Sequence, residues 1–161
     1  MRIATAQFAV ATDPEQNLAT VARLLAEADA AGARVLLLPE GIIARDPANP
    51  DITGAAAQPA DGPFMTALRR LSRDSDVALA TTVHLIEDGA IFNVFVVLLR
   101  GEELLHYRKL HLYDAFASRE SDRVTPGGVI PPLVTIDGWA FGALTCYDVR
   151  FPELARAHAV A

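Results

Sequence analysis

The sequence predicts an α/β fold in which two helices pack on one face of a mixed β-sheet. The first half of the chain alternates strand, helix, strand and helix, an order that is typical of parallel strands joined by helices. A run of strands linked by two-residue turns follows, and strands linked in this way pair antiparallel. The 161 residues, of which 52% are hydrophobic, are enough for one domain with its own core.

The first helix lies between two predicted strands. Residues 2–9 predict a strand, after which Asp13 and Pro14 are expected to open a helix as its N-cap and its first helical residue. The apolar stripe on one face of this helix consists of Leu18, Val21, Leu25 and Ala28. Gly32 is expected to end the helix, and the wholly apolar residues 35–38 then predict a strand that is covered on both faces.

A second helix and three strands are expected in the middle of the chain. Residues 44–63 are rich in Ala, Asp, Pro and Gly and predict a loop with at most a short helical piece. A helix is expected to begin at residues 61–63 and to bury Phe64, Leu68 and Leu71. The expected strands cover residues 77–85, 90–99 and 102–107, with Asp88-Gly89 and Arg100-Gly101 as the turns between them.

The only cysteine lies in a predicted strand-to-helix turn near the end of the sequence. Residues 110–132 predict an irregular segment, and strands are expected over residues 133–136 and, as a buried strand, over residues 139–144. Cys146 follows that strand, and Pro152 is expected to begin a helix. A helix N-terminus would favour the thiolate form of Cys146, although a single cysteine taken alone is more often a small buried hydrophobe.

Composition and charge exclude several classes of function. The net charge is −6 and no basic patch is present, so we expect no nucleic-acid partner. No apolar run has the length of a membrane span and the N-terminus does not resemble a signal peptide, so we expect no membrane association and a cytoplasmic location. One cysteine can form neither an internal disulfide nor a Cys/His metal cluster, and the four histidines lack metal-ligand spacing, so neither a metal nor a cofactor is expected.

Three chemically active residues each follow a predicted strand, namely Glu40, Lys109 and Cys146. If these strands are neighbours, the three side chains meet at one edge of the sheet, where the sites of open α/β sheets lie. A cysteine thiolate attacks an amide carbon, a carboxylate takes and returns the proton, and an ammonium stabilises the oxyanion together with the backbone N–H of Tyr147. Taken singly, Glu40 is also explained as a carboxylate at a helix start and Lys109 as a solvated surface lysine.

Three segments of the chain resemble the signature segments of the nitrilase superfamily of carbon–nitrogen hydrolases. They are residues 37–41 (LLPEG), 107–112 (YRKLHL) and 144–153 (LTCYDVRFPE), and residues 3–7 (IATAQ) and 92–93 (FN) also resemble strands of the family. The resemblance implies an α-β-β-α sandwich with a catalytic triad. In this triad Glu40 is the general base, Lys109 stabilises the oxyanion, and Cys146 is the nucleophile that forms a thioester.

The resemblance also implies further site residues. Many members of the superfamily carry a second glutamate near the site, and Glu120 is the candidate here. The alternative is that Glu120 is a loop carboxylate paired with Arg119 or Arg123. The same two arginines and Arg150 could contact the carboxylates of a substrate, although Arg150 is instead expected to brace the start of the last helix through a carboxylate of its own turn.

The substrate class also follows from the resemblance. Residues 109–117 are most similar to the deaminated glutathione amidases, which implies a small-molecule amide substrate and its cleavage to 2-oxoglutarate and cysteinylglycine. An omega-amidase, or another carbon–nitrogen hydrolase, is the alternative within the superfamily. A protease-like pair of Cys146 with His111 is a further alternative.

Superfamily domains are longer than this chain. Residues 1–161 are therefore expected to be the N-terminal portion of a carbon–nitrogen hydrolase domain that lacks its C-terminal part. The alternative from another functional class is an inactive or association-only domain. The superfamily also implies a homodimer or a larger homo-oligomer.

Overall fold

The computed structural model describes residues 1–116 and 118–161, so residue 117, which closes the segment 109–117, lies outside the described residues. The helices are α1 (Pro14–Ala30), α2 (Ile52–Ala55), α3 (Pro63–Arg73) and α4 (Pro152–Val160), and the 3₁₀ helices are η1 (Glu120–Asp122) and η2 (Cys146–Arg150). The strands are β1 (Ile3–Thr5), β2 (Val35–Leu37), β3 (Gln58–Pro59), β4 (Ala78–Glu87), β5 (Ala90–Leu99), β6 (Glu102–Arg108), β7 (Asp114–Ala115), β8 (Ser118–Arg119), β9 (Val134–Ile136) and β10 (Trp139–Phe141).

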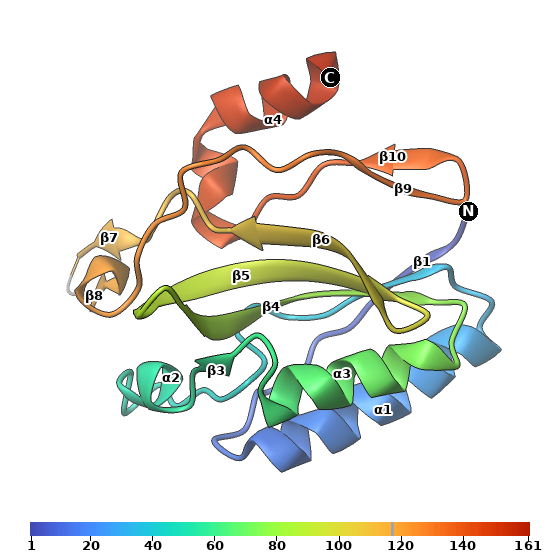
Figure 1. Cartoon of the computed structure of the whole chain (residues 1–161), viewed down its shortest axis with the longest axis horizontal. Coiled ribbons are helices and arrows are strands. Elements are labelled where there is room, and N and C mark those ends of the chain that lie inside the picture. Colours follow the sequence, from blue (N-terminus) through green and yellow to red (C-terminus); the bar gives the residue numbers. More distant parts are fainter. Residues whose placement is uncertain (117) are drawn as a thin grey trace.

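A mixed sheet forms the middle layer of the molecule. Its strand order is β1-β2-β4-β5-β6, with β3 beside β4. Strands β1, β2 and β4 are parallel, whereas β4, β5 and β6 are antiparallel. Figure 1 shows α1 and α3 side by side under one face of this sheet, and the β9–β10 hairpin and α4 over the other face. The predicted α/β fold with helices on the outer face of a mixed sheet is confirmed.

The two long helices have the ends and the buried faces that the sequence predicts. The carboxylate of Asp13 caps α1 by accepting the N–H of Glu15 at 2.9 Å. Gly32 follows the helix with a φ of 67°, a left-handed conformation that glycine adopts without strain. The expected face of each helix is buried apart from Leu18 of α1 and Leu71 of α3, which are partly buried. In the described part of the chain, no helix combines the length and the apolar character that crossing a membrane requires.

The sheet separates two apolar clusters, because successive side chains of a strand point to opposite faces. Leu79 of β4 packs in one cluster with Val21 of α1 and Leu68 of α3. Its neighbour Ala80 faces the other way and belongs to a second cluster with Leu154 of α4. The sheet therefore divides the core into two clusters, one on each of its faces. Neither cluster includes the polar residues that follow the strands.

Tight turns set the register of the central strands. Asp88 and Gly89 have φ angles of 52° and 77°, which are typical of a type I′ hairpin turn. This turn pairs Glu87 with Ala90 and, further along, places His84 directly opposite Asn93 in the β4–β5 ladder. The turn at Arg100 and Gly101 has the same left-handed conformation.

The segment 139–144 differs from the prediction of a buried strand. Strand β10 ends at Phe141, and Trp139 is 61% exposed. The reason is that β10 pairs with β9 alone and forms a two-stranded sheet, so one side of the hairpin faces solvent. An apolar run in the sequence does not distinguish such a hairpin from a buried central strand. In the part of the chain that the structure describes, two two-stranded sheets, β9–β10 and β7–β8, accompany the main sheet.

Candidate active site

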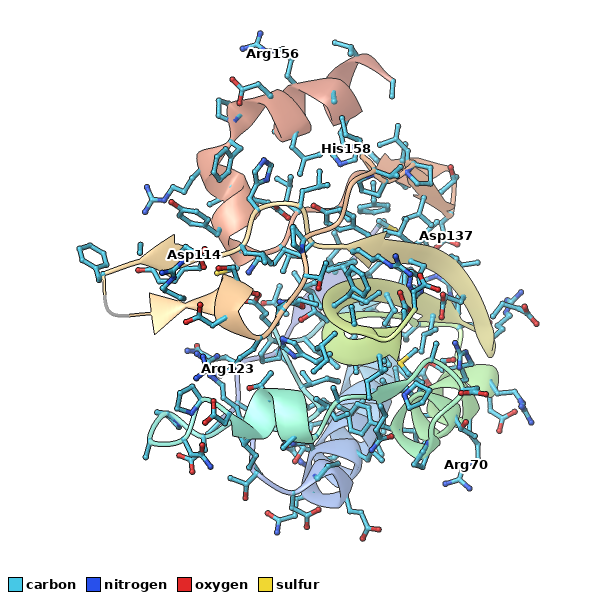
Figure 2. The ribbon with its side chains drawn as sticks, turned by 60° about the vertical axis from the view of Figure 1, so that its left-hand side comes forward. Arg70, Asp114, Arg123, Asp137, Arg156 and His158 are labelled. Atoms are coloured by element: carbon cyan, nitrogen blue, oxygen red, sulfur yellow. The ribbon has the colours of Figure 1, made fainter. Side chains whose placement is uncertain are left out.

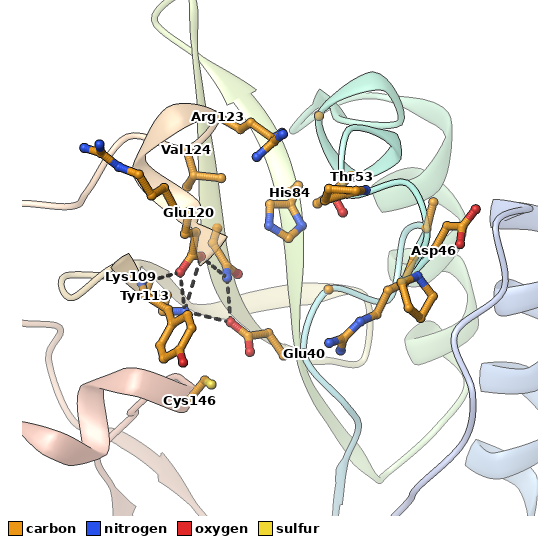
Figure 3. A pocket seen from close by; sticks show the side chains of 18 residues that line it. Glu40, Asp46, Thr53, His84, Lys109, Tyr113, Glu120, Arg123, Val124 and Cys146 are labelled. Atoms are coloured by element: carbon orange, nitrogen blue, oxygen red, sulfur yellow. Dashed lines mark hydrogen bonds and ion pairs between the residues drawn. The ribbon is translucent and has the colours of Figure 1, made fainter. Parts of the chain in front are cut away.

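The three residues predicted to form a triad lie together in one pocket. Glu40 follows β2, Lys109 follows β6, and Cys146 is the first residue of η2. All three line a pocket of about 330 Å³, and Figure 3 shows Lys109 and Glu40 joined side by side with Cys146 close to both. The strands are not neighbours as expected: β4 and β5 lie between β2 and β6, and the strand before Cys146, β10, lies outside the main sheet, so Cys146 reaches the pocket from the β9–β10 hairpin and η2.

Lys109 is the buried centre of this arrangement. Its ammonium Nζ donates to Glu40 Oε1 at 2.9 Å and to Glu120 Oε2 at 2.9 Å, and Glu120 Oε1 lies 3.2 Å away. Burial lowers the pKa of Lys109, but the charges and hydrogen bonds of Glu40 and Glu120 outweigh burial and hold this pKa above its ordinary value. The ammonium therefore remains a charged donor inside the pocket.

Glu40 is held as a carboxylate that points into the pocket. Its Oε1 accepts from Asn93 Nδ2 at 2.8 Å as well as from Lys109. Burial raises the pKa of Glu40, whereas the charge of Lys109 and the hydrogen bonds from Lys109, Asn93 and Cys146 lower it below its ordinary value. A carboxylate that stays ionised beside a thiol can act as its general base.

Cys146 rests as a protonated thiol, which corrects the expected effect of the helix N-terminus. Cys146 is exposed, but partial desolvation of its sulfur and the negative charge of Glu40 raise the pKa of Cys146 above its ordinary value. Helix α4 begins only at Pro152, and the short helix η2 lies between it and the thiol, so the positive end of α4 does not adjoin the sulfur. The φ of Cys146 is 47°, a strained conformation for a residue with a side chain.

Glu120 contacts the triad rather than the loop arginines. It accepts from Lys109, from Asn93 Nδ2 at 3.3 Å and from the backbone N–H of Tyr113 at 2.8 Å. Arg119 instead lies 3.6 Å from Asp122, and Arg123 pairs with Asp51. The alternative that paired Glu120 with either arginine is therefore wrong.

The pairing of Arg123 with Asp51 joins two walls of the pocket. Asp51 precedes α2, and Arg123 follows η1, so two segments far apart in the sequence meet at this ion pair. Figure 2 shows Arg123 between these two elements, on the same side of the molecule as Asp114. Both Arg119 and Arg123 line the pocket.

A buried carboxylate that the sequence analysis did not single out organises the turn of Cys146. Asp148 is fully buried and accepts from the phenol of Tyr107 at 2.8 Å, from the backbone N–H of Thr145 at 2.9 Å and from the backbone N–H of His111 at 3.0 Å. The ring nitrogen Nδ1 of His111 lies 2.7 Å from the same carboxylate. We call Tyr107, His111, Thr145 and Asp148 the Asp148 cluster. It ties η2 to the end of β6.

His111 and Arg150 do not lie where the sequence-based alternatives place them. The imidazole of His111 faces Asp148 and stacks on Phe151 at 3.7 Å between ring centroids, and it does not line the pocket. A pair of Cys146 with His111 therefore has no geometric support. Arg150 is exposed and lies outside the pocket lining, and in the described residues it forms no ion pair with Asp148. Both expectations for Arg150, substrate contact and local bracing, lack support.

Tyr147 follows Cys146, and its backbone N–H is the predicted oxyanion donor. Its ring packs edge-on against Tyr113, which lines the pocket, at 5.2 Å between centroids, and against Phe151 at 5.4 Å. These contacts fix the backbone that carries the Tyr147 N–H.

Two further residues of the pocket, Asn93 and His84, have no predicted role at the site. Asn93 is buried and its side-chain N–H₂ joins Glu40 to Glu120. His84 is also buried in the pocket wall, and burial lowers its pKa to about 4. The turn Asp88-Gly89 could have found both, because a two-residue hairpin turn fixes which residues of β4 and β5 face each other. Within the described ranges, no three His, Cys, Asp or Glu side chains form a group that could hold a metal ion.

The chain is similar to known carbon–nitrogen hydrolases over its whole length. Residues 2–161 match the family described as carbon–nitrogen hydrolase. The chain is 41% identical to a deaminated glutathione amidase of Escherichia coli O157:H7, over 99% of this chain and 62% of that protein. It is 36% identical to a hydrolase of Mycobacterium tuberculosis H37Rv, over 96% of this chain and 55% of that protein. The chain therefore spans less than two thirds of the length of these relatives.

Solved structures share the same fold. An amidase of the nitrilase superfamily from Nesterenkonia AN1 superposes with a TM-score of 0.86 at 31% identity, over 99% of this chain and 60% of that one. Other structures of the Nesterenkonia amidase record the Michael addition of acrylamide at its active-site cysteine and a complex with butyramide. A superfamily protein from Xanthomonas campestris, with an arsenic adduct in its active site, has a TM-score of 0.83 at 25% identity, over 95% of this chain and 56% of that one.

Proposed function

The chain belongs to the carbon–nitrogen hydrolase family, and we propose on that premise that the protein hydrolyses an amide bond through a thioester on Cys146. The observation that carries this proposal is the ion pair of Lys109 with Glu40 in the pocket that Cys146 lines. The acrylamide adduct on the active-site cysteine of the Nesterenkonia amidase supports a nucleophilic role for the cysteine of this chain.

In the proposed first step the Cys146 sulfur attacks the amide carbon while Glu40 takes the thiol proton. The raised pKa of Cys146 makes this proton transfer necessary, because the resting sulfur is a thiol. The ammonium of Lys109 and the backbone N–H of Tyr147 donate to the oxyanion. One such preorganised donor lowers the barrier by roughly 2.7–4 kcal/mol.

Two stages follow, namely breakdown of the first intermediate to a thioester and hydrolysis of that thioester. Glu40 returns its proton to the amide nitrogen, the carbon–nitrogen bond breaks, and the amine leaves while the acyl group remains on Cys146 as a thioester. Water next attacks the thioester while Glu40 takes a proton from it; the carbon–sulfur bond then breaks, Glu40 returns the proton to the sulfur, and the carboxylic acid leaves. Glu120 and Asn93 are positioning residues in this scheme, since they hold Lys109 and Glu40 by the hydrogen bonds described above.

Deaminated glutathione is the substrate that we propose first. Two relatives at 41% and 31% identity are named deaminated glutathione amidases. The arginines Arg119 and Arg123 line the pocket and suit a substrate that carries carboxylates. An omega-amidase or another small-amide hydrolase is the second candidate, which the butyramide complex of the Nesterenkonia amidase favours.

A substrate panel tests the proposal. Release of cysteinylglycine from deaminated glutathione should exceed release of ammonia from oxo-acid amides and from simple aliphatic amides in kcat/KM. Faster turnover of the oxo-acid amides would favour the second candidate. Absence of turnover with every amide would favour the association-only alternative, which size-exclusion chromatography would then examine together with the proposed homo-oligomer.

A further inference from the structure

Among the described residues His84 has no hydrogen-bond partner, although it is buried beside the proposed catalytic residues. It is 6% exposed and lines the pocket that Glu40, Lys109 and Cys146 share. Its ring makes no hydrogen bond to any residue that the structure describes, and its Nδ1 is buried without a partner. A buried polar atom without a partner costs about 1–3 kcal/mol, so a native site that keeps one has a reason for it. His84 is thus a polar residue of the pocket wall whose hydrogen-bonding capacity the described residues leave unused, and a ligand in the pocket can use it.

The surroundings of His84 place its ring next to the reacting groups. His84 lies directly opposite Asn93 in the β4–β5 ladder, so the two side chains share one face of the sheet. The side-chain N–H₂ of Asn93 donates to Glu40 and Glu120, while its Oδ1 is a second buried atom that has no partner in the described ranges. Figure 3 shows the His84 ring in the pocket on the far side of Glu40 and Glu120 from Cys146.

Gly41, which follows Glu40, leaves room for this ring. A Cβ at position 41 would lie 3.3 Å from Cε1 and 3.6 Å from Nδ1 of His84, so a side chain there would crowd the imidazole. The φ of Gly41 is also 69°, which favours glycine. The backbone that carries the Glu40 carboxylate and the imidazole are therefore in close contact.

The charges around His84 indicate what kind of group it meets. Burial lowers the pKa of His84 to about 4, with the charge of Lys109 acting in the same direction and the charges of Glu120 and Glu40 opposing it. The ring is therefore neutral at neutral pH and offers one donor and one acceptor. An anionic group at this point would gain no ion pair from His84 and would meet the two carboxylates. An uncharged polar group can hydrogen-bond the ring without either penalty.

We propose that His84 is a specificity-determining residue whose imidazole hydrogen-bonds an uncharged polar group of the substrate, such as a hydroxyl, keto or amide group, bound next to Glu40. This inference rests on the proposed amidase function. It assigns the polar, uncharged part of the substrate to the wall formed by His84 and Asn93, and any substrate carboxylate to the arginines of the pocket, Arg119 and Arg123.

Matched amides test this assignment. Lactamide and isobutyramide differ only in a hydroxyl that replaces a methyl group, and 3-hydroxybutyramide and isovaleramide differ in the same way one carbon further out. For each pair we compare kcat/KM for the hydroxyl amide with kcat/KM for its methyl partner. In at least one pair this ratio should be about 3- to 10-fold lower in His84→Leu than in the wild type, as expected for the loss of one hydrogen bond to an uncharged group. Either His84→Asn, which places an amide near Nδ1, or His84→Gln, which places one near Nε2, should restore the ratio.

A control variant and a binding measurement separate the possible failures. His106→Asn alters a histidine of β6 that bonds Glu103 and lies outside the pocket lining, and it should leave both ratios unchanged. Unchanged ratios in His84→Leu, with Cys146 still alkylated by iodoacetamide at the wild-type rate, overturn the assignment. If the wild type releases no ammonia from any amide, the proposed function fails. The ¹⁵N chemical shifts of the His84 ring in Cys146→Ser then test the assignment of His84. These shifts should change when a hydroxyl amide is added and not when its methyl partner is added. Equal changes with both amides overturn the assignment.

Discussion

The phenol of Tyr107 donates to the buried carboxylate of Asp148 at 2.8 Å. Tyr107 lies two residues before Lys109, and Asp148 lies two residues after Cys146, so this one hydrogen bond joins the backbone of the proposed oxyanion stabiliser to that of the proposed nucleophile. The Tyr107 oxygen also accepts the backbone N–H of Leu110 at 3.1 Å. The relative position of the two proposed catalytic residues thus depends on a contact outside the pocket.

Tyr107→Phe should lower both stability and activity. The variant removes a hydrogen bond to a charged, buried acceptor, and we expect the free energy of unfolding to fall by about 1.5–3 kcal/mol. Urea denaturation measures this loss, and kcat for amide hydrolysis should fall in the folded variant because the Cys146 turn is less well held. Wild-type stability together with wild-type kcat in Tyr107→Phe would show that the Asp148 cluster does not position the turn.

Glu40→Gln should lower the pKa of Cys146 while slowing hydrolysis. The negative charge of Glu40 helps to raise this pKa, so removing the charge should shift the pH profile of Cys146 alkylation by iodoacetamide to lower pH. Hydrolysis should nevertheless fall by about 10²- to 10⁴-fold, because the general base is lost. An unchanged alkylation profile would indicate that Glu40 does not act on the thiol.

The Lys109 interaction should make stability depend on pH. The pKa of Glu40 is lowered on folding, so its contribution is fully present above the ordinary value of 4.5 and is lost as the pH falls through the lower folded value. Lys109→Met leaves Glu40 and Glu120 facing each other without the cation, which should destabilise the protein at pH 7. The difference in free energy of unfolding between wild type and Lys109→Met should shrink as the pH falls below 4.5, because protonation of Glu40 removes its repulsion with Glu120. A difference that stays constant from pH 7 to pH 3 would contradict this account.

Gly127 should tolerate no side chain, whereas its neighbour should. The Gly127 N–H donates to the Lys109 carbonyl at 2.8 Å, and a Cβ at position 127 would collide with the carbonyl oxygen of Arg108. Gly127→Ala should therefore cost about 1–3 kcal/mol of stability and displace Lys109. Gly128→Ala is the matched control, since no atom lies within 4 Å of its added Cβ. Equal melting temperatures for the two variants would refute the role of this contact.

The sequence predicts the elements whose signals are local. Asp13, Pro14 and Gly32 define α1, and the turn at Asp88 and Gly89 defines the β4–β5 hairpin. The same turn also contains the information that His84 faces Asn93, because counting back from a two-residue turn fixes the register. Local turn chemistry therefore predicts more of the site than the motifs alone suggest.

The remaining features depend on contacts between distant segments. Asp148 accepts from Tyr107 and His111, which lie 41 and 37 residues away in the sequence, so no local pattern predicts the Asp148 cluster. The protonated state of Cys146 likewise depends on partial desolvation and on Glu40, and local reasoning from a helix start predicted the opposite. The exposure of Trp139 depends on which strands β10 pairs with, and this too is decided by tertiary structure.

Amide hydrolysis by Cys146→Ala tests the central proposal most directly. The variant removes the sulfur and leaves the pocket and the Asp148 cluster in place, so its thermal melting curve should match that of the wild type. The account predicts no detectable cysteinylglycine release from deaminated glutathione and no ammonia release from the amides that the wild type hydrolyses. Turnover by the folded Cys146→Ala variant at a rate near that of the wild type would contradict a thioester mechanism on this residue.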